Sequence, residues 1–255
     1  MRSTLAVMAA MALLLSSGTA LASSDHHPTY VLVHGAFHGG WSWQALSARL
    51  RAHNARVYTP TLTGLGDRAH LARPDVGLST HVQDIVSMIE MEDLRDVILV
   101  GHSYSGMVIT GVAAAVPGRI KKLVYFDAVI PEPGQSFFQA IAFTPPAEDM
   151  TMMPSFPPEA FGLTEPEHIA YVAPRLRSQP MATFEEPLTF SWGALSRIQK
   201  VYIHCKRPWF SRDTFLSFRA KALERNWGYE ELDASHDAMV TEVEGTARVL
   251  RRVAR

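Results

Sequence analysis

Short strand-like segments separated by helical sequence recur along this chain and constrain its fold more than any other feature. Residues 29–33 are β-branched or apolar without alternation, which is typical of a strand covered on both faces of a parallel sheet. Further strands are expected at residues 56–58, 97–100, 122–126, 201–205 and 229–232. Because strands and helices alternate, we predict an α/β fold with a mainly parallel sheet flanked by helices.

Helical periodicity is clearest just before the second buried strand. Val82, Ile85, Val86 and Ile89 fall at i, i+3, i+4 and i+7, and Ser79 is the expected N-cap of this helix. A helix of small residues is expected at 107–116, and the chain closes with an amphipathic segment at 242–253. These helices would pack on the sheet.

One segment, about residues 130–195, breaks the alternation. It holds eleven of the sixteen prolines together with many Met and aromatic residues. Proline is excluded from central strands, so this segment cannot supply one. Its apolar content favours a packed lid of short helices over a poorly ordered insertion.

The N-terminus has the features of a secretory signal peptide. Arg2 gives a positive start, Leu5 to Leu15 is an uninterrupted apolar run, and Ala20-Leu21-Ala22 fits the small-x-small cleavage pattern. The apolar run is shorter than the roughly 20 residues that a membrane-spanning helix needs. We therefore expect residues 1–22 to be removed, no stable membrane insertion, and a periplasmic or secreted domain at residues 23–255.

Charge and cysteine content exclude several function classes. Lys and Arg number 24 against 25 Asp and Glu, a formal net charge of -1, so the chain has no basic excess to neutralise nucleic-acid phosphates. Cys205 is the only cysteine, which excludes an internal disulfide and a Cys-x-x-Cys metal or redox site. The oligomeric state is left open.

The residues Gly101-His102-Ser103-Tyr104-Ser105-Gly106 carry the strongest chemical signal. They follow an apolar strand and precede a helix, the setting of a nucleophile elbow, in which a sharp turn presents a serine hydroxyl above the sheet edge. The usual pattern is G-x-S-x-G, and here Ser105 occupies the position of the second glycine. We predict that Ser103 is a nucleophile.

A serine nucleophile needs a base, and His236 is the candidate. It lies in a loop after the last expected strand, which returns the chain to the sheet edge that carries Ser103. With eleven histidines in the chain, an ordinary surface histidine is the alternative.

A carboxylate must orient that histidine, and three acids compete for the role. Asp127 follows the strand next in sequence after the elbow and gives the chain order Ser, Asp, His. Asp213 follows the strand at 201–205 at a greater distance, and Glu132 is the third candidate. We favour Asp127.

The oxyanion of an attacked ester needs preorganised donors. The backbone N–H groups of Tyr104, after the nucleophile, and of Ala36, in the turn after the first strand, are the candidates. His34 and His38 in the same turn are interpreted as turn packing rather than a metal pair, because no third ligand is evident.

Together these motifs resemble the α/β-hydrolase superfamily, in particular the branch of methyl-salicylate-type esterases, EstC-like esterases and hydroxynitrile lyases. The similar segments are VLVHGAFHGGWSW (31–43), YTPTLTGLGDRAHL (58–71), VILVGHSYSG (97–106), YFDAVIPEPGQSF (125–137) and SHDAMV (235–240). The resemblance implies the same serine, histidine and oxyanion donors.

It also exposes a departure. Many members of this branch carry their acid after the strand matching 201–205, where this chain has Pro208. Some haloalkane dehalogenases place it after the strand matching 122–126, where Asp127 stands. Dehalogenation itself is disfavoured, because those enzymes use an aspartate where this chain has Ser103.

The leading hypothesis is a serine carboxylesterase that needs no cofactor or metal. Its lid would favour small to medium apolar alkyl or aryl esters. Related lyases look to a lysine after the catalytic histidine and a threonine in the oxyanion turn, where this chain has Asp237 and Ala36. A hydrolase-fold binding protein with weak turnover is the other alternative.

Overall fold

The computed structural model describes residues 27–144 and 149–255, and the predicted signal peptide lies outside them. The main sheet has six strands in the order β2-β1-β3-β4-β7-β8, all pairs being parallel. Its strands are β1 (Thr29–Val33), β2 (Arg56–Tyr58), β3 (Val97–His102), β4 (Ile120–Phe126), β7 (Gln199–Cys205) and β8 (Gly228–Leu232). The predicted fold class and all six expected strands are confirmed.

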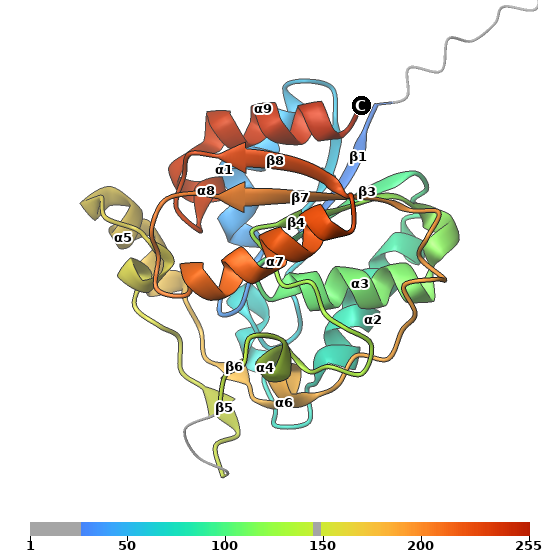
Figure 1. Cartoon of the computed structure of the whole chain (residues 1–255). Coiled ribbons are helices and arrows are strands. Elements are labelled where there is room, and N and C mark those ends of the chain that lie inside the picture. Colours follow the sequence, from blue (N-terminus) through green and yellow to red (C-terminus); the bar gives the residue numbers. More distant parts are fainter. Residues whose placement is uncertain (1–26, 145–148) are drawn as a thin grey trace, which may run out of the picture.

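Helices cover both faces of this sheet (Figure 1). One layer contains α1 (Gln44–Arg51), α8 (Ala238–Thr241) and α9 (Val243–Val253), and the other contains α2 (Leu78–Met91), α3 (Ser105–Ala115) and α7 (Arg212–Glu224).

Two buried cores result from the alternation of side chains along each strand. In β1, Val31 and Val33 enter the core on the α2 and α3 side, whereas Tyr30 and Leu32 enter the core on the α1 and α9 side. Successive strand side chains point to opposite faces, so a strand buried on both faces must be apolar throughout.

The start of α2 differs from the prediction. Its N-cap is Gly77, and Ser79 lies in the first turn. The Ser79 N–H donates to a carboxylate oxygen of Glu186, 2.9 Å away. An acid from a distant segment therefore satisfies the helix end, which local sequence does not reveal.

The described parts of the proline-rich segment, residues 130–144 and 149–195, contain short helices and one antiparallel pair of short strands. The helices are α4 (Phe137–Ala140), α5 (Pro166–Val172) and α6 (Ala182–Glu185), and β5 (Met152–Met153) pairs antiparallel with β6 (Gln179–Pro180). This segment also contains short 3₁₀ turns at Pro158–Phe161 and Ala173–Arg175. Elsewhere in the described chain, 3₁₀ turns occur at Gly40–Trp43, Gly66–Leu71 and Pro117–Arg119. Figure 1 shows α4, β6 and α6 gathered below the α2 and α3 layer.

Four phenylalanines of this segment are buried and join the core on the α2 and α3 side: Phe137, Phe138, Phe161 and Phe184. Within residues 27–144 and 149–255, no helix is both long enough and apolar enough to cross a membrane.

Candidate active site

The predicted site residues follow four strands at the same edge of the sheet. Ala36 lies after β1, Ser103 after β3, Asp127 after β4 and His236 after β8. Because all these strands are parallel, their carboxyl ends meet at one edge, where sites of open α/β sheets form.

Ser103 occupies a sharp turn between β3 and α3. Its φ of 55° lies in the left-handed region, which is uncommon for a residue other than glycine and is characteristic of a strained elbow. A Cβ at Gly106 would lie 1.9 Å from the Val129 carbonyl oxygen, so no larger residue fits there.

Ser105, the departure from the usual elbow pattern, is fully buried. Its hydroxyl donates to the carbonyl of His34, the residue that follows β1. This contact satisfies the extra hydroxyl and links the elbow to the turn that carries Ala36.

His236 and Asp127 form a buried pair. The His236 Nδ1 lies 2.7 Å from the Asp127 Oδ2, and the two side chains are 1% and 0% exposed. The Cys205 N–H donates to the Asp127 Oδ1 at 3.3 Å, and the His204 Nδ1 lies 3.5 Å from the same oxygen. The carboxylate is therefore held from two sides.

These contacts decide the charge of Asp127. Burial raises the pKa of its carboxyl group. The contacts with His204, His236 and the Cys205 N–H lower that pKa by more than burial raises it, so the net pKa lies below the ordinary value. Asp127 is thus ionised at neutral pH and can hold an imidazole in one tautomer.

The two rival acids lie elsewhere. The Asp213 side chain is 95% exposed at the start of α7 and is 3.7 Å from Arg212. Glu132 pairs with Lys221 at 2.9 Å and Arg225 at 2.7 Å. Among the three candidate acids, only Asp127 meets His236.

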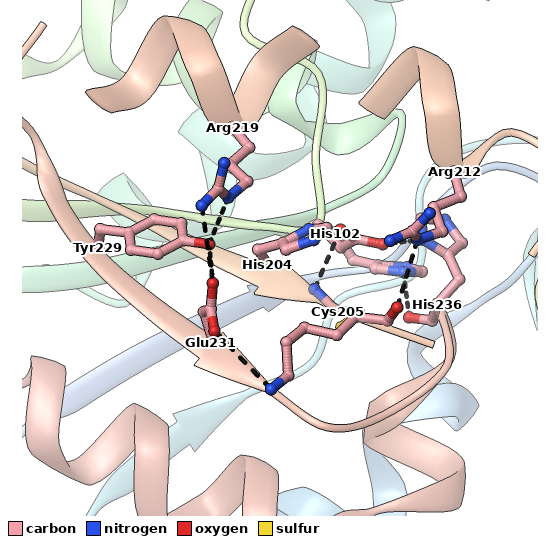
Figure 2. Close-up of polar contacts among 10 residues, drawn as sticks. His102, His204, Cys205, Arg212, Arg219, Tyr229, Glu231 and His236 are labelled. Carbon is pink, nitrogen blue, oxygen red and sulfur yellow. Dashed lines mark hydrogen bonds and ion pairs between the residues drawn. The ribbon is translucent and has the colours of Figure 1, made fainter. Parts of the chain in front are cut away.

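Aromatic rings enclose the His236 imidazole. The Trp209 ring stacks on it at a centroid distance of 3.7 Å and an interplanar angle of 16°, and His102 lies 4.4 Å away. Figure 2 shows His102 and His236 together, apart from the contacts of Arg219, Tyr229 and Glu231. Trp209 directly follows Pro208, which stands where many related proteins carry their acid. Nothing in the local sequence indicates that Trp209 stacks on His236.

Ser103, His236 and Ala36 line one apolar cavity of about 80 Å³. Its other lining residues are Phe37, Phe137, Phe138, Ile141, Phe143, Met153, Phe156, Phe161, Phe184, Trp209, Phe210, Ser211 and Phe215. The backbone N–H groups of Ala36 and Tyr104 donate to no other group in the described part of the chain. Ala36 lines the cavity together with Ser103, and Tyr104 directly follows Ser103 in the chain.

The Ser103 hydroxyl forms no hydrogen bond with His236 among the described residues. Such contacts are often loose until substrate binds. Residues 27–144 and 149–255 contain no group of three or more His, Cys, Asp or Glu side chains placed to hold a metal ion.

A strained serine elbow, a buried His–Asp pair and two free N–H groups at the edge of a parallel sheet define an α/β-hydrolase site. The family model for the alpha/beta hydrolase family matches residues 30–249, and the chain belongs to this family.

Esterases are prominent among its relatives. A carbendazim hydrolyzing esterase of Nocardioides sp. (strain SG-4G) is 42% identical over 190 residues, covering 68% of this chain and 78% of the relative. Salicylic acid-binding protein 2 of Nicotiana tabacum is 26% identical over 88% of this chain and 96% of its own length.

A solved structure of similar shape is an extracellular α/β-hydrolase from a Paenibacillus species. It is 25% identical, with a TM-score of 0.72, over 88% of this chain and 98% of its own. That Paenibacillus protein shares structural and functional homology with tobacco salicylic acid-binding protein 2. These matches support a hydrolase of the esterase type.

Proposed function

We propose that this protein is a serine carboxylesterase in which Ser103 is the nucleophile, His236 the general base and Asp127 the residue that orients His236. The observation that carries the proposal is the buried contact of 2.7 Å between His236 and Asp127 beside the cavity that holds Ser103. The esterase relatives support the same class of reaction.

The reaction proceeds in two halves. The Ser103 oxygen attacks the ester carbonyl carbon while His236 takes its proton, and His236 then returns that proton to the leaving alcohol. Water attacks the resulting acyl-enzyme with His236 again as base, which releases the acid and restores Ser103. Asp127 stabilises the imidazolium in both halves.

The negative oxygen that develops on the substrate requires donors placed in advance. The N–H groups of Ala36 and Tyr104 serve this purpose, because both follow strands that end at the Ser103 edge and neither has another acceptor in the described chain. Their contribution is largest in the transition state.

The cavity favours small apolar esters, including aryl esters. Its volume of about 80 Å³ is well below the roughly 300–1,000 Å³ of pockets for drug-sized ligands. Its walls are mainly phenylalanine and other apolar rings, which suit a planar or short alkyl group. Because the 42% identical relative is a carbendazim hydrolyzing esterase, carbendazim belongs in the substrate panel.

An ester panel tests the proposal. Short p-nitrophenyl and methyl aryl esters, with carbendazim, are assayed with the wild type, Ser103→Ala and His236→Ala. We expect hydrolysis by the wild type, a burst of one p-nitrophenol per chain where deacylation is slow, and loss of at least about a thousandfold in kcat in both variants. Binding without acylation would instead indicate a ligand-binding protein.

We further propose that the chain is exported to the periplasm or medium after cleavage following Ala22. The basis is the charged start, the apolar run and the small-x-small pattern of the first 22 residues. Intact mass measurement of protein recovered outside the cytoplasm is expected to give a chain that begins at Ser23. A chain retaining Met1 in the cytoplasm would contradict export.

A further inference from the structure

A second buried His–Asp pair contacts the turn that carries Ala36, the candidate oxyanion donor. The Nε2 of His38 is 3.0 Å from the Oδ2 of Asp237, and the side chains are 1% and 0% exposed. The proposed reaction uses neither residue. Burying two charged groups costs free energy even when they are paired, so a role is expected for a pair in this position.

The hydrogen bonds of His38 determine its protonation. Its Nδ1 lies 2.7 Å from the Ala36 carbonyl, which can only accept, so Nδ1 carries a hydrogen. Its Nε2 faces a carboxylate. Burial alone would lower the pKa of His38, but Asp237 and the Ala36 carbonyl raise that pKa above its ordinary value. The pair is an imidazolium and a carboxylate.

The carbonyl that His38 holds belongs to the peptide between Ala36 and Phe37. The N–H of this same peptide donates to the Oε1 of Gln179 at 2.9 Å. Phe37 has a φ of 67°, in the left-handed region that costs free energy for a residue other than glycine. Contacts at both ends of the peptide therefore hold a strained turn that places the Ala36 N–H.

Asp237 connects this turn to the loop of the candidate base, since it follows His236 directly. The Ala36 turn comes from β1 and the His236 loop from β8, which are not neighbours in the sheet. The His38–Asp237 contact is a direct bond between these two loops, 199 residues apart in sequence.

We propose that His38 and Asp237 are positioning residues, which fix the oxyanion turn relative to the His236 loop through the bond from His38 to the Ala36 carbonyl. This inference rests on the proposed esterase function. A purely structural alternative exists, because His38 also stacks on Trp41 at a centroid distance of 5.3 Å. A positioning role depends on the hydrogen bond from the His38 Nδ1 to the Ala36 carbonyl, whereas a purely structural role depends on the packing of the ring.

Two substitutions at residue 38 separate the two nitrogens. In His38→Asn the amide nitrogen takes the place of Nδ1 and can still donate to the Ala36 carbonyl. In His38→Gln the amide nitrogen takes the place of Nε2 and retains only the contact with Asp237. His53→Gln, at an exposed histidine, is the matched control.

We expect His38→Gln to lower kcat about tenfold or more with KM within about twofold, since a displaced oxyanion donor acts on the transition state. His38→Asn is expected to retain several-fold more of kcat, and His53→Gln to match the wild type. Equal losses in the two residue-38 variants, or losses confined to KM, would overturn the inference.

Asp237 provides a second test if the residue-38 variants fold poorly. In Asp237→Asn the amide can donate to the Nε2 of a neutral His38, so both bonds of His38 survive. In Asp237→Leu the partner is lost. We expect kcat to fall more in Asp237→Leu than in Asp237→Asn, and an equal fall in both contradicts a role through His38.

A measurement without catalysis separates this inference from the proposed function. Nuclear magnetic resonance of the ¹⁵N-labelled Ser103→Ala protein is expected to show two exchange-protected ring N–H protons on His38, which Asp237→Leu reduces to one. A wild type inactive on every ester would refute the esterase, while two protected protons would still support the paired turn. A single ring proton in Ser103→Ala would refute the imidazolium pair itself.

Discussion

The Nδ1 of His236 and the Oδ2 of Asp127 are 2.7 Å apart although 109 residues separate them in the chain. The contact forms because β4 and β8 end at the same edge of the sheet, on either side of β7. The other Asp127 oxygen accepts the Cys205 N–H at the end of β7. The carboxylate is thus fixed by the strand that lies between the two loops.

Asp127→Asn is expected to lower kcat by roughly a thousandfold, because an amide no longer stabilises the imidazolium or selects its tautomer. Steady-state kinetics on a p-nitrophenyl ester measures the change. The matched control is Asp213→Asn, which changes an exposed carboxylate and should leave kcat within about twofold of the wild type. If Asp213→Asn costs more than Asp127→Asn, the acid belongs to the later loop.

Trp209→Leu is expected to reduce kcat several-fold. The indole stacks on His236 at 3.7 Å, and its face both restrains the ring and favours the imidazolium that forms during proton transfer. Trp209→Phe, which keeps an aromatic face, should retain more of kcat. Trp192→Leu is the control, because Trp192 packs on Trp227 away from the cavity. Equal kcat values for the three variants would exclude a role for the stacking.

Phe143→Ala is expected to shift the preference of the enzyme towards longer acyl chains. Phe143 is half-buried, lines the cavity and packs on Phe138, so its removal enlarges a small apolar site. The kcat/KM ratio for p-nitrophenyl hexanoate over acetate measures the shift. Phe190→Ala, at a half-buried phenylalanine outside the cavity, should leave this ratio unchanged. A similar ratio in both variants would place the acyl group elsewhere.

The protein is expected to lose stability in mild acid, because its fold buries neutral histidines. Burial lowers the pKa of His34 to about 3 and that of His81 to about 4. Their hydrogen bonds agree, since the His34 Nε2 accepts the Leu62 N–H at 3.0 Å and the His81 Nε2 faces the Thr63 carbonyl at 2.9 Å. Each ring holds a single proton.

The unfolded chain binds protons at these rings once the pH falls below about 6.5, and the folded chain does not until about pH 4 for His81 and pH 3 for His34. Stability therefore falls with decreasing pH across those windows. At pH 5 each ring should cost about 2 kcal/mol of the free energy of unfolding. The raised pKa of His38 acts in the opposite direction and offsets part of this loss.

Urea unfolding at pH 7.5 and pH 5.0 measures the loss. His81→Gln should be less stable than the wild type at pH 7.5 yet lose about 2 kcal/mol less on acidification. His53→Gln, at an exposed ring, should keep the dependence of the wild type on pH. An identical loss in wild type and His81→Gln would show that His81 is not the neutral group inferred from its contacts.

Local pattern alone determined the sheet, its six strands and the two loops that hold Ser103 and His236. Apolar runs with β-branched residues identify strands buried on both faces, and a small-residue turn between a strand and a helix presents one side chain at the sheet edge. These features depend on neighbours within a few residues. The sequence therefore carries them directly.

Only the tertiary structure decided which acid meets His236, what caps α2 and what His38 does. Asp127 and Asp213 both follow strands, and their difference lies in the approach of β4 to β8 across β7. Glu186 at the start of α2 and Asp237 beside His38 are likewise contacts between distant segments. Partners of buried charges are selected by the packing of whole elements, which single-residue patterns do not encode.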